Sequence, residues 1–266
     1  MIDYHLHTKR CHHAVGDVEE YLEEAAAKGL VEVGFADHFP LDLLGYCPKH
    51  PVTMAGQELE AYIKSITDLA SRSGRPRVRL GIEVDYLPGK ERETRFHLQQ
   101  YPFDYVMGSV HFIEDWDFSH PQQEKGFREG CIESIYEAYF DRVRKMAASR
   151  LFDMVGHIDV IKKFGYHSSE EHMAGIIEAA VAVIGEADLC VEFNTSGWRA
   201  PVGEQYPSRA FLQALFREGI PVTLGSDAHC PSHVGEGIRR GVEVLKDVGY
   251  RRAALFRRRK RCYINL

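Results

Sequence analysis

A His, Glu or Asp stands at the carboxyl end of one short apolar run after another along this chain. The runs are rich in Val, Ile and Phe, as parallel strands buried on both faces are. We therefore predict strands at residues 2–5, 31–37, 78–84, 104–110, 154–158, 189–194 and 221–226. Side chains that project from the carboxyl ends of several strands are how a barrel of parallel strands builds an active site. This pattern indicates an α/β enzyme with its site at one end of a sheet.

Helical patterns fill most of the gaps between these runs. Asp17-Val18-Glu19-Glu20 is typical of a capping box, and Gly29 would end the helix that it opens. Apolar residues at helical spacing predict further helices at 57–73, 128–149, 169–187 and 208–218. The β–α alternation runs without a Ser/Pro-rich linker, which predicts one barrel-like α/β domain over residues 1–266 with a mainly parallel sheet. We expect residues 41–51 to form an active-site loop.

Composition excludes several classes of partner. A chain of 266 residues can bury the core of one α/β barrel. Its net charge of -6 argues against nucleic acid as an obligatory partner. No apolar run approaches the roughly 20 residues that span a bilayer, and no signal peptide precedes Ile2. The six scattered cysteines are typical of reduced thiols, so we predict a cytoplasmic protein without a membrane partner.

One stretch of the chain is strongly basic. Residues 251–261 are dense in Arg and Lys. A nucleic-acid or membrane patch is one interpretation, and a solvated basic face near the end of the sequence is the one we favour. The sequence does not indicate an oligomeric state.

The first and last motifs carry paired ligand types. On a strand, side chains two residues apart point to the same face, so His5 and His7 can chelate one ion. Asp227 and His229 can likewise project into one cavity. Cys11 and Cys230 lie beside these motifs, and we expect burial as small apolar residues rather than metal binding.

Further candidates occur at the ends of the strands between these two motifs. His38 ends the second run, and Glu83 ends the third, sharing one strand face with Asp85. Carboxylates on a buried strand need a partner, which is usually a cation. His111 and His157 each stand at a strand end just after a Gly. Any one of these residues could be an ordinary core residue, but their recurrence at successive strand ends predicts a metal site.

The chain resembles the polymerase-and-histidinol-phosphatase (PHP) superfamily and, within it, the stand-alone histidinol-phosphatase family. The resemblance covers nearly the whole chain, and the motifs that carry it are His5-Leu6-His7, Asp37-His38-Phe39-Pro40, Gly81-Ile82-Glu83-Val84-Asp85-Tyr86, Tyr101-Pro102-Phe103-Asp104-Tyr105, Gly108-Ser109-Val110-His111, Gly156-His157-Ile158-Asp159, Lys162-Lys163-Phe164-Gly165, Asn194-Thr195 with Arg199, and Gly225-Ser226-Asp227-Ala228-His229. Ala36 departs from the family pattern, which usually has Thr there, but this removes no ligand.

The resemblance implies a distorted seven-stranded (β/α) barrel that holds three divalent metal ions. Carried onto this sequence, the ligand sets are His5, His7, Glu83 and Asp227 for the first ion, Glu83, His111 and His157 for the second, and His13, His38 and His229 for the third. His13 is preferred over His12 because of the family's spacing. Asp37, Asp85 and Asp159 have the placement of carboxylates that orient ligating imidazoles. Zinc, manganese and iron all suit imidazole ligands, so the sequence does not rank them.

The implied activity is the hydrolysis of a phosphate monoester. Because this reaction is very slow uncatalysed, it needs charge stabilisation and a strong nucleophile. Two ions about 3.5–4 Å apart, bridged by Glu83, would lower the pKa of an attacking water. Arg199 is the first choice for holding the phosphate, with Lys162 or Lys163 second unless these lysines are surface charges. Asp227 or His229 would protonate the leaving group.

The resemblance further implies L-histidinol phosphate, an intermediate of histidine biosynthesis, as the substrate. Asp117, Tyr86, Trp116 and Trp198 could recognise its cationic part, or the aromatic residues could belong to the core. Three alternatives stay open. They are a PHP phosphoesterase acting on nucleotides or oligonucleotides, a non-catalytic metal-stabilised binding module, and an amidohydrolase-like carbon–nitrogen hydrolase.

Overall fold

Seven parallel strands form the centre of the molecule. The computed structural model describes every residue except Ser73 and Arg75. The strands pair in the order β1-β2-β3-β4-β7-β8-β9. Their bounds are Ile2–Leu6 (β1), Glu32–Phe35 (β2), Arg77–Asp85 (β3), Tyr105–Ser109 (β4), Met154–Val155 (β7), Cys190–Asn194 (β8) and Val222–Gly225 (β9). Each predicted strand is present. The fifth ends earlier than expected, because His157 has a φ of 20°, which an extended strand does not allow.

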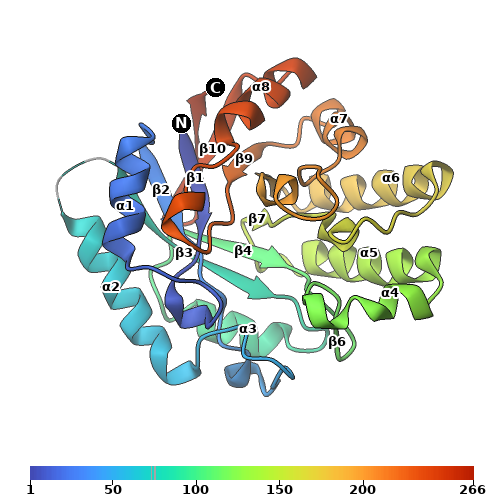
Figure 1. Cartoon of the computed structure of the whole chain (residues 1–266), viewed down its shortest axis with the longest axis horizontal. Helices are drawn as coiled ribbons and strands as arrows, with labels where there is room; N and C mark the ends of the chain where they lie inside the picture. Colours follow the sequence, from blue (N-terminus) through green and yellow to red (C-terminus); the bar gives the residue numbers. More distant parts are fainter. Residues whose placement is uncertain (73, 75) are drawn as a thin grey trace.

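The two edges of this sheet approach each other and nearly close a barrel. Beyond the end of β9, Ala228 forms a parallel bridge with Leu6 of β1. The His7 amide donates to the Ala228 carbonyl at 3.0 Å, and the Ala228 amide donates to the His5 carbonyl at 3.1 Å. Figure 1 shows the strands at the centre with helices around them. The expected seven-stranded barrel is thereby confirmed.

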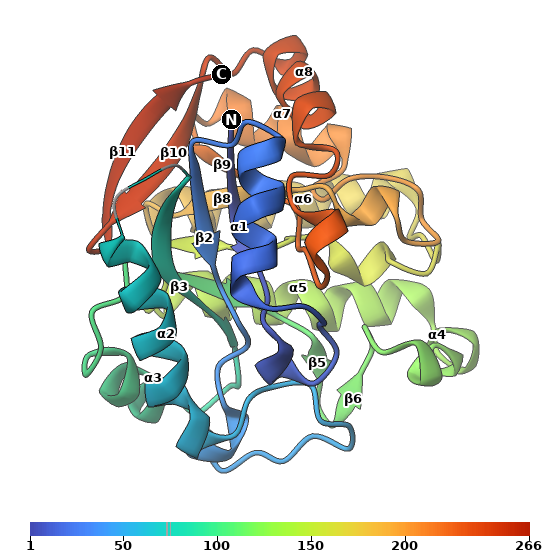
Figure 2. The ribbon, with the colours of Figure 1, turned by 60° about the vertical axis from the view of Figure 1, so that its left-hand side comes forward.

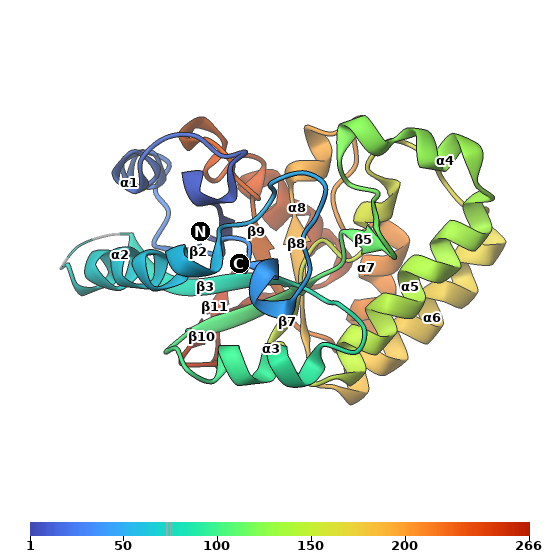
Figure 3. The same ribbon diagram turned by 90° about the horizontal axis from the view of Figure 1, so that it is seen from below.

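Helices surround the barrel. They span Val18–Ala27 (α1), Leu59–Ser71 (α2), Glu91–Leu98 (α3), Lys125–Glu129 (α4), Ile132–Ala148 (α5), Glu170–Glu186 (α6), Arg209–Arg217 (α7) and Ile238–Val248 (α8). Short 3-10 helices occupy Lys9–Cys11, Leu41–Leu44, Gly56–Glu58, Pro121–Gln123, Val160–Lys162, Ser196–Trp198 and Pro231–His233. Figure 3 shows α5 and α6 side by side on the outside of the barrel. Among the described residues, no helix has the length and apolar character needed to cross a membrane.

The helix predictions hold with three differences. The carboxylate of Glu20 accepts a hydrogen bond from the Asp17 amide at 2.6 Å, as the predicted capping box requires. The helix expected at 57–73 is α2, and its predicted end at Ser73 lies outside the described residues. The helix expected at 128–149 is divided at Gly130 into α4 and α5. Neither α3 nor α8 was predicted. In α3 only Thr94 and Leu98 are buried, so this helix has almost no apolar stripe to detect.

Two small hairpins lie at opposite ends of the barrel. One consists of β5 (Phe112–Ile113) and β6 (Trp116–Asp117), and the other of β10 (Arg252–Arg257) and β11 (Lys260–Asn265). In β10, the Phe256 ring packs 6.3 Å from that of Tyr4, and the Phe256 amide donates to the Tyr4 hydroxyl at 3.2 Å. The β10–β11 hairpin lies at the end of the molecule that holds both termini, whereas β5 and β6 lie at the other end (Figures 1 and 2).

The β10–β11 hairpin corrects part of the interpretation of the basic stretch. Residues 257–260 are exposed, as a solvated basic face requires. However, Ala253, Ala254, Leu255 and Phe256 are buried against the starts of the barrel strands. The Arg and Lys residues on both sides of this apolar run made the whole stretch look like an exposed basic face. The sequence analysis therefore did not predict a hairpin.

Candidate metal centre

The candidate ligands gather at the carboxyl end of the barrel. Parallel strands end on the same side of a sheet, so residues at or after the ends of β1, β3, β4, β7 and β9 come together there. A cavity of about 650 Å³ opens at this end. Of the nine predicted ligands, six line it: His13, His38, His111, His157, Asp227 and His229. The other three, His5, His7 and Glu83, are at most 1% exposed.

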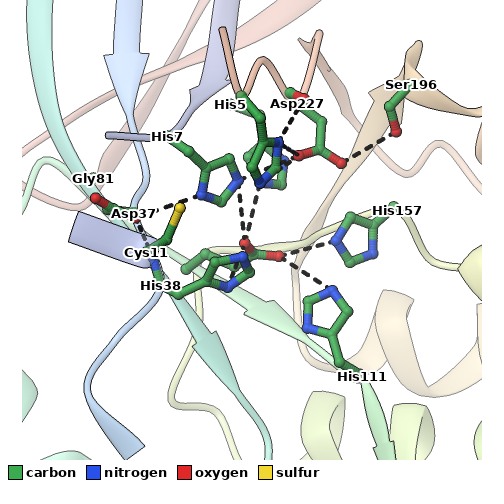
Figure 4. A network of polar contacts seen from close by, with 12 residues as sticks. His5, His7, Cys11, Asp37, His38, Gly81, His111, His157, Ser196 and Asp227 are labelled. Carbon is green, nitrogen blue, oxygen red and sulfur yellow. Dashed lines mark hydrogen bonds and ion pairs between the residues drawn. The ribbon is translucent and has the colours of Figure 1, made fainter. Parts of the chain in front are cut away.

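Glu83 lies at the centre of the group. Its Oε2 atom is 3.2 Å from His5 Nε2 and 3.1 Å from His38 Nδ1. Its Oε1 atom is 2.9 Å from His157 Nε2 and 3.9 Å from His111 Nε2. Because His7 Nε2 also lies 3.6 Å from Oε2, this oxygen faces three imidazoles and Oε1 faces two others. Figure 4 shows these four rings, together with His7, converging on one place.

Asp227 extends the group on the side of β1 and β9. Its Oδ1 atom is 3.2 Å from His7 Nε2, 3.4 Å from His229 Nδ1 and 3.8 Å from His5 Nε2. The backbone of Asp227 has a φ of 54°, in the left-handed region that Asp tolerates better than most residues. One carboxylate is thus shared among three imidazoles.

His13 and His229 face each other in a way that favours a cation between them. Their Nε2 atoms are 2.9 Å apart. The Nδ1 atom of His13 lies 2.7 Å from the Cys11 carbonyl, and that of His229 lies 3.1 Å from the Asp227 carbonyl. A carbonyl only accepts, so both Nδ1 atoms carry a proton, and in the neutral rings both Nε2 atoms present lone pairs. Two lone pairs at this distance repel each other unless a cation lies between them.

The donor set as a whole fits divalent metal ions. Groups of at least three ligand atoms lie within 4.8 Å of one another, among them His5–His7–Glu83, His5–His157–Asp227 and His7–His38–His229. His7 Nε2 is buried without a hydrogen-bond partner among the described residues, and so is His38 Nδ1. Imidazole nitrogens with carboxylate oxygens are the ligands that zinc, manganese and iron accept.

Charge in the site also suits metal binding. Burial by itself would raise the pKa of Glu83, but His38 and His5 hold this pKa well below its usual value. Burial opposes ionisation of Asp227 in the same way, yet His5 and His7 keep its pKa well below the ordinary one. For His38 and His229, burial lowers the pKa well below that of a free imidazole. Charged carboxylates and neutral imidazoles are the forms that bind metals. Burial opposes it, but the surrounding carboxylates raise the pKa of His5 and His7 well above the ordinary value, so these two rings would release a proton on binding a metal.

The two cysteines beside the motifs differ in their surroundings. Cys11 is fully buried, as predicted. Its sulfur nevertheless lies within the ligand groups, close to His13 and His229 on one side and to His7 and Asp37 on the other. Cys230 is only partly buried, and its sulfur is 3.2 Å from the Ser232 hydroxyl.

Comparison with known proteins identifies the family. The model of the PHP domain matches residues 3–196, which is well over half of the chain. The chain belongs to the PHP domain family.

Two relatives of this chain are both named as histidinol-phosphatases. A probable histidinol-phosphatase from Deinococcus radiodurans is 38% identical over 261 residues, covering 98% of each chain. The histidinol-phosphatase from Bacillus subtilis is 33% identical over 255 residues, which is 88% of this chain and 95% of the relative.

Two solved structures share the fold. The histidinol phosphate phosphatase from Lactococcus lactis, in complex with zinc, L-histidinol and phosphate, superimposes with a TM-score of 0.85, at 22% identity and 98% coverage of both chains. A putative histidinol phosphatase from Listeria monocytogenes gives a TM-score of 0.80 at 26% identity, covering 90% of this chain and 99% of that one.

In this PHP domain, two of the three expected orienting carboxylates lie beside imidazoles. Asp85 Oδ1 is 2.9 Å from His111 Nδ1, and Asp37 Oδ1 is 3.6 Å from His7 Nδ1. Burial opposes it, but Asp85 raises the pKa of His111 to about 9. The prediction that Asp159 orients an imidazole is wrong. Its carboxylate pairs with the Lys162 ammonium at 2.9 Å and accepts a hydrogen bond from the Ser208 amide at 2.7 Å. It therefore fixes the chain after β7, and it has no hydrogen bond to an imidazole among the residues that the structure describes.

Glu192 takes the role that the sequence interpretation gave to Asp159. It is fully buried in β8 and accepts from His5 Nδ1 at 2.7 Å and from the His157 amide at 2.8 Å. A Cβ atom on Gly225 would lie only 1.9 Å from Glu192 Oε1, so the neighbouring strand must carry Gly there. The signal was present in the sequence, because Glu192 is a carboxylate inside a buried strand, as Glu83 is.

Two of the three cations predicted to hold phosphate line the cavity, and the third does not. Arg199 lines the cavity and donates through Nη2 to the Ser226 carbonyl at 2.6 Å. Lys163 also lines the cavity, and its ammonium donates to the Ser119 carbonyl at 2.9 Å. Lys162 does not line it, since its ammonium is buried between Asp159 and Glu204, 2.6 Å from the latter. We therefore no longer expect Lys162 to contact a substrate.

Of the four residues expected to recognise the cationic part of the substrate, one lines the cavity. Asp117 lines the cavity, and its Oδ1 atom accepts from the hydroxyl of Ser119 at 2.8 Å. The three aromatic candidates, Tyr86, Trp116 and Trp198, do not line it. Trp116 is partly buried and packs against the core, with its ring 4.9 Å from that of Phe127.

The loop expected at 41–51 does contribute to the cavity. Its His50 and Pro51 line the wall, and the His50 ring stacks on that of His120 with centroids 4.1 Å apart. This stack joins the loop to the segment that follows the β5–β6 hairpin. The sequence interpretation expected the loop at the site but did not single out either imidazole.

Proposed function

We propose that this PHP domain is a metal-dependent histidinol-phosphatase that converts L-histidinol phosphate and water to L-histidinol and phosphate. Glu83 is the observation that carries the proposal, because its two oxygens face separate groups of imidazoles, so that one carboxylate could serve two metal ions. The histidinol-phosphatases of D. radiodurans and B. subtilis support the substrate. So do the zinc, L-histidinol and phosphate bound to the L. lactis enzyme.

The proposal includes about three divalent ions per chain. The first set of ligands is His5, His7, Glu83 and Asp227, the second is Glu83, His111 and His157, and the third is His13, His38 and His229. When bound, such ions supply Lewis acidity toward the phosphoryl oxygens and lower the pKa of water. The position of His38 between Glu83 and the ring of His13 leaves it able to serve more than one set. Zinc, manganese and iron all remain compatible with these ligands.

The protein's own side chains would hold the substrate and move its proton. Arg199 and Lys163 are the cations of the cavity wall suited to phosphate oxygens. Asp117, on the same cavity, would attract the ammonium group of histidinol. His229 and Asp227 are the groups placed to protonate the departing alkoxide.

The remaining parts of the proposal concern organisation and partners. We treat residues 1–266 as one domain that acts on a small phosphate monoester, in the cytoplasm, without an obligatory nucleic acid. A nucleotide- or oligonucleotide-directed activity finds no support in the basic stretch, which lies at the opposite end of the barrel. There, Arg259 pairs with Asp153 at 2.8 Å and Arg261 with Asp188 at 2.6 Å.

A phosphate-release assay on the metal-loaded protein tests this function. We expect kcat/KM for histidinol phosphate to exceed that for an aryl phosphate or a nucleotide by at least about a hundredfold, because buried polar groups stay unpaired with the wrong substrate. Arg199→Ala should harm all monoesters alike, whereas Asp117→Asn should mainly reduce the preference. Equal efficiency on all substrates would favour a broader phosphoesterase, and no release from any of them would favour a binding module.

A further inference from the structure

Tyr206 is a buried residue of the cavity that the sequence did not single out. It follows the 3-10 turn Ser196–Trp198 and pairs with Asn194 at the carboxyl end of β8. The Tyr206 amide donates to the Asn194 carbonyl at 3.0 Å, and the Asn194 amide donates back at 2.6 Å. The side chain is 1% exposed and lines the 650 Å³ cavity. Its backbone is therefore fixed beside the metal ligands.

The hydroxyl of Tyr206 has no hydrogen-bond partner within residues 1–72, 74 and 76–266. Three other fully buried tyrosines donate to carbonyls, namely Tyr62 to Phe35 at 2.9 Å, Tyr105 to Tyr4 at 2.6 Å and Tyr139 to Ile158 at 2.9 Å, and Tyr4 donates to the Glu32 carboxylate. Burying a hydroxyl without a partner costs free energy, so such a group calls for an explanation. A ligand in the cavity would supply the missing acceptor.

Tyr206 shares the cavity wall with donor groups and with the Asp227 carboxylate. Arg199 Nη1 is likewise buried without a hydrogen bond among the described residues, 3.6 Å from the Glu236 carboxylate. Lys163 and Ser196 line the same cavity, but the Lys163 ammonium donates to the Ser119 carbonyl at 2.9 Å and the Ser196 hydroxyl to Asn194 Oδ1 at 2.7 Å. Burial raises the pKa of Tyr206 well above its ordinary value, so its hydroxyl stays protonated. A protonated phenol beside a guanidinium suits an acceptor that carries negative charge.

We propose that the Tyr206 hydroxyl donates a hydrogen bond to the phosphoryl group of the substrate, beside Arg199. This inference rests on the proposed phosphatase function and adds a substrate-contacting residue to it. The ammonium of histidinol only donates, which leaves the phosphate oxygens and one imidazole nitrogen as acceptors of the substrate. The guanidinium of Arg199, which acts on the same hydroxyl, matches the negatively charged one of these, the phosphate.

Calorimetric titration of the metal-loaded protein with inorganic phosphate tests the contact without turnover. Tyr206→Phe removes only the hydroxyl, and it should weaken phosphate binding about 10- to 100-fold, the scale of a hydrogen bond to a charged group. Metal content and the thermal midpoint should stay at the wild-type values, because the hydroxyl has no hydrogen-bond partner in the described part of the chain. The matched control is Tyr136→Phe. That hydroxyl donates to the Tyr166 carbonyl at 2.6 Å, away from the cavity, so its loss should lower the midpoint and leave phosphate binding unchanged.

The outcomes separate this inference from the proposed function. Wild-type binding of phosphate with no change in Tyr206→Phe would overturn the inference alone. A fall in metal content or thermal midpoint in Tyr206→Phe would also overturn it, because the hydroxyl would then serve the fold. Weaker binding of L-histidinol with unchanged phosphate binding would place the hydroxyl on the wrong part of the substrate. Failure of the wild-type protein to bind phosphate would overturn the proposed function, and the inference with it.

Discussion

At the scale of single residues, tautomers separate His13 from its neighbour His12. The Cys11 carbonyl fixes the proton of His13 on Nδ1, which leaves Nε2 free to face His229. His12 ends the 3-10 helix Lys9–Cys11 with a φ of 67° and lines the cavity without a comparable partner among the described residues. From the sequence, only the family resemblance favoured His13 over His12. A hydrogen bond to a backbone carbonyl cannot be predicted from the residue types.

Replacing each of these histidines tests that distinction. We predict that His13→Ala loses one metal ion per chain and most of the phosphatase activity, because a ligand disappears. His12→Ala should keep the metal and most of the activity. Metal quantification and phosphate release on both variants give the answer. An essential His12 with a dispensable His13 would mean that the third ligand set is wrongly assigned.

Glu192 acts through His5, so its effect should appear in metal affinity. Glu192→Gln weakens the acceptor that holds His5 Nδ1, and we expect metal retention against a chelator to fall about 10- to 100-fold. Glu32→Gln is the matched control at the other end of the barrel, where Glu32 is equally buried and accepts from Arg79 at 2.8 Å. It should cost about 1–3 kcal/mol of stability with metal retention unchanged. Equal metal retention in both variants would exclude a positioning role for Glu192.

At the scale of elements, the β10–β11 hairpin covers the end of the barrel away from the site. Phe256 is 2% exposed and packs against Tyr4 and Tyr105, while the adjacent Arg257 is exposed. We predict that Phe256→Ala lowers the free energy of unfolding by about 3–5 kcal/mol, because it leaves a cavity in the core. Arg257→Ala should change it by no more than about 0.5 kcal/mol. Urea unfolding of both variants measures this, and similar values would show that the hairpin contributes little to the core.

Some elements were predictable from the sequence and others were not, for physical reasons. The seven barrel strands are buried on both faces, so the sequence of each strand is a continuous apolar run. The strand β10 shares that property over residues 253–256 but is flanked by arginines, which made the whole stretch resemble a solvated face. Strand β1 pairs with β2 through a register shift between Asp3 and Leu6, and simple alternation along the strand cannot anticipate such a shift.

At the scale of the whole molecule, the ligand types were predictable but their partners were not. Closure of β1 onto the end of β9 brings His7 within 3.2 Å of Asp227, although 220 residues separate them (227 − 7). Both residues could be predicted as ligands because polar groups at the ends of apolar strands are unusual. It could not show that Lys162 turns toward Asp159 and Glu204, or that Tyr206 lies in the cavity, because loops set both positions.

Metal quantification of the purified protein, set beside that of Glu83→Ala, tests the central claim most directly. We predict about three divalent ions per wild-type chain and the loss of two in Glu83→Ala, since one carboxylate serves two sets of imidazoles. Circular dichroism would show that the variant is folded. Wild-type protein that binds no stoichiometric metal, or a folded Glu83→Ala variant that retains every ion, would contradict the account.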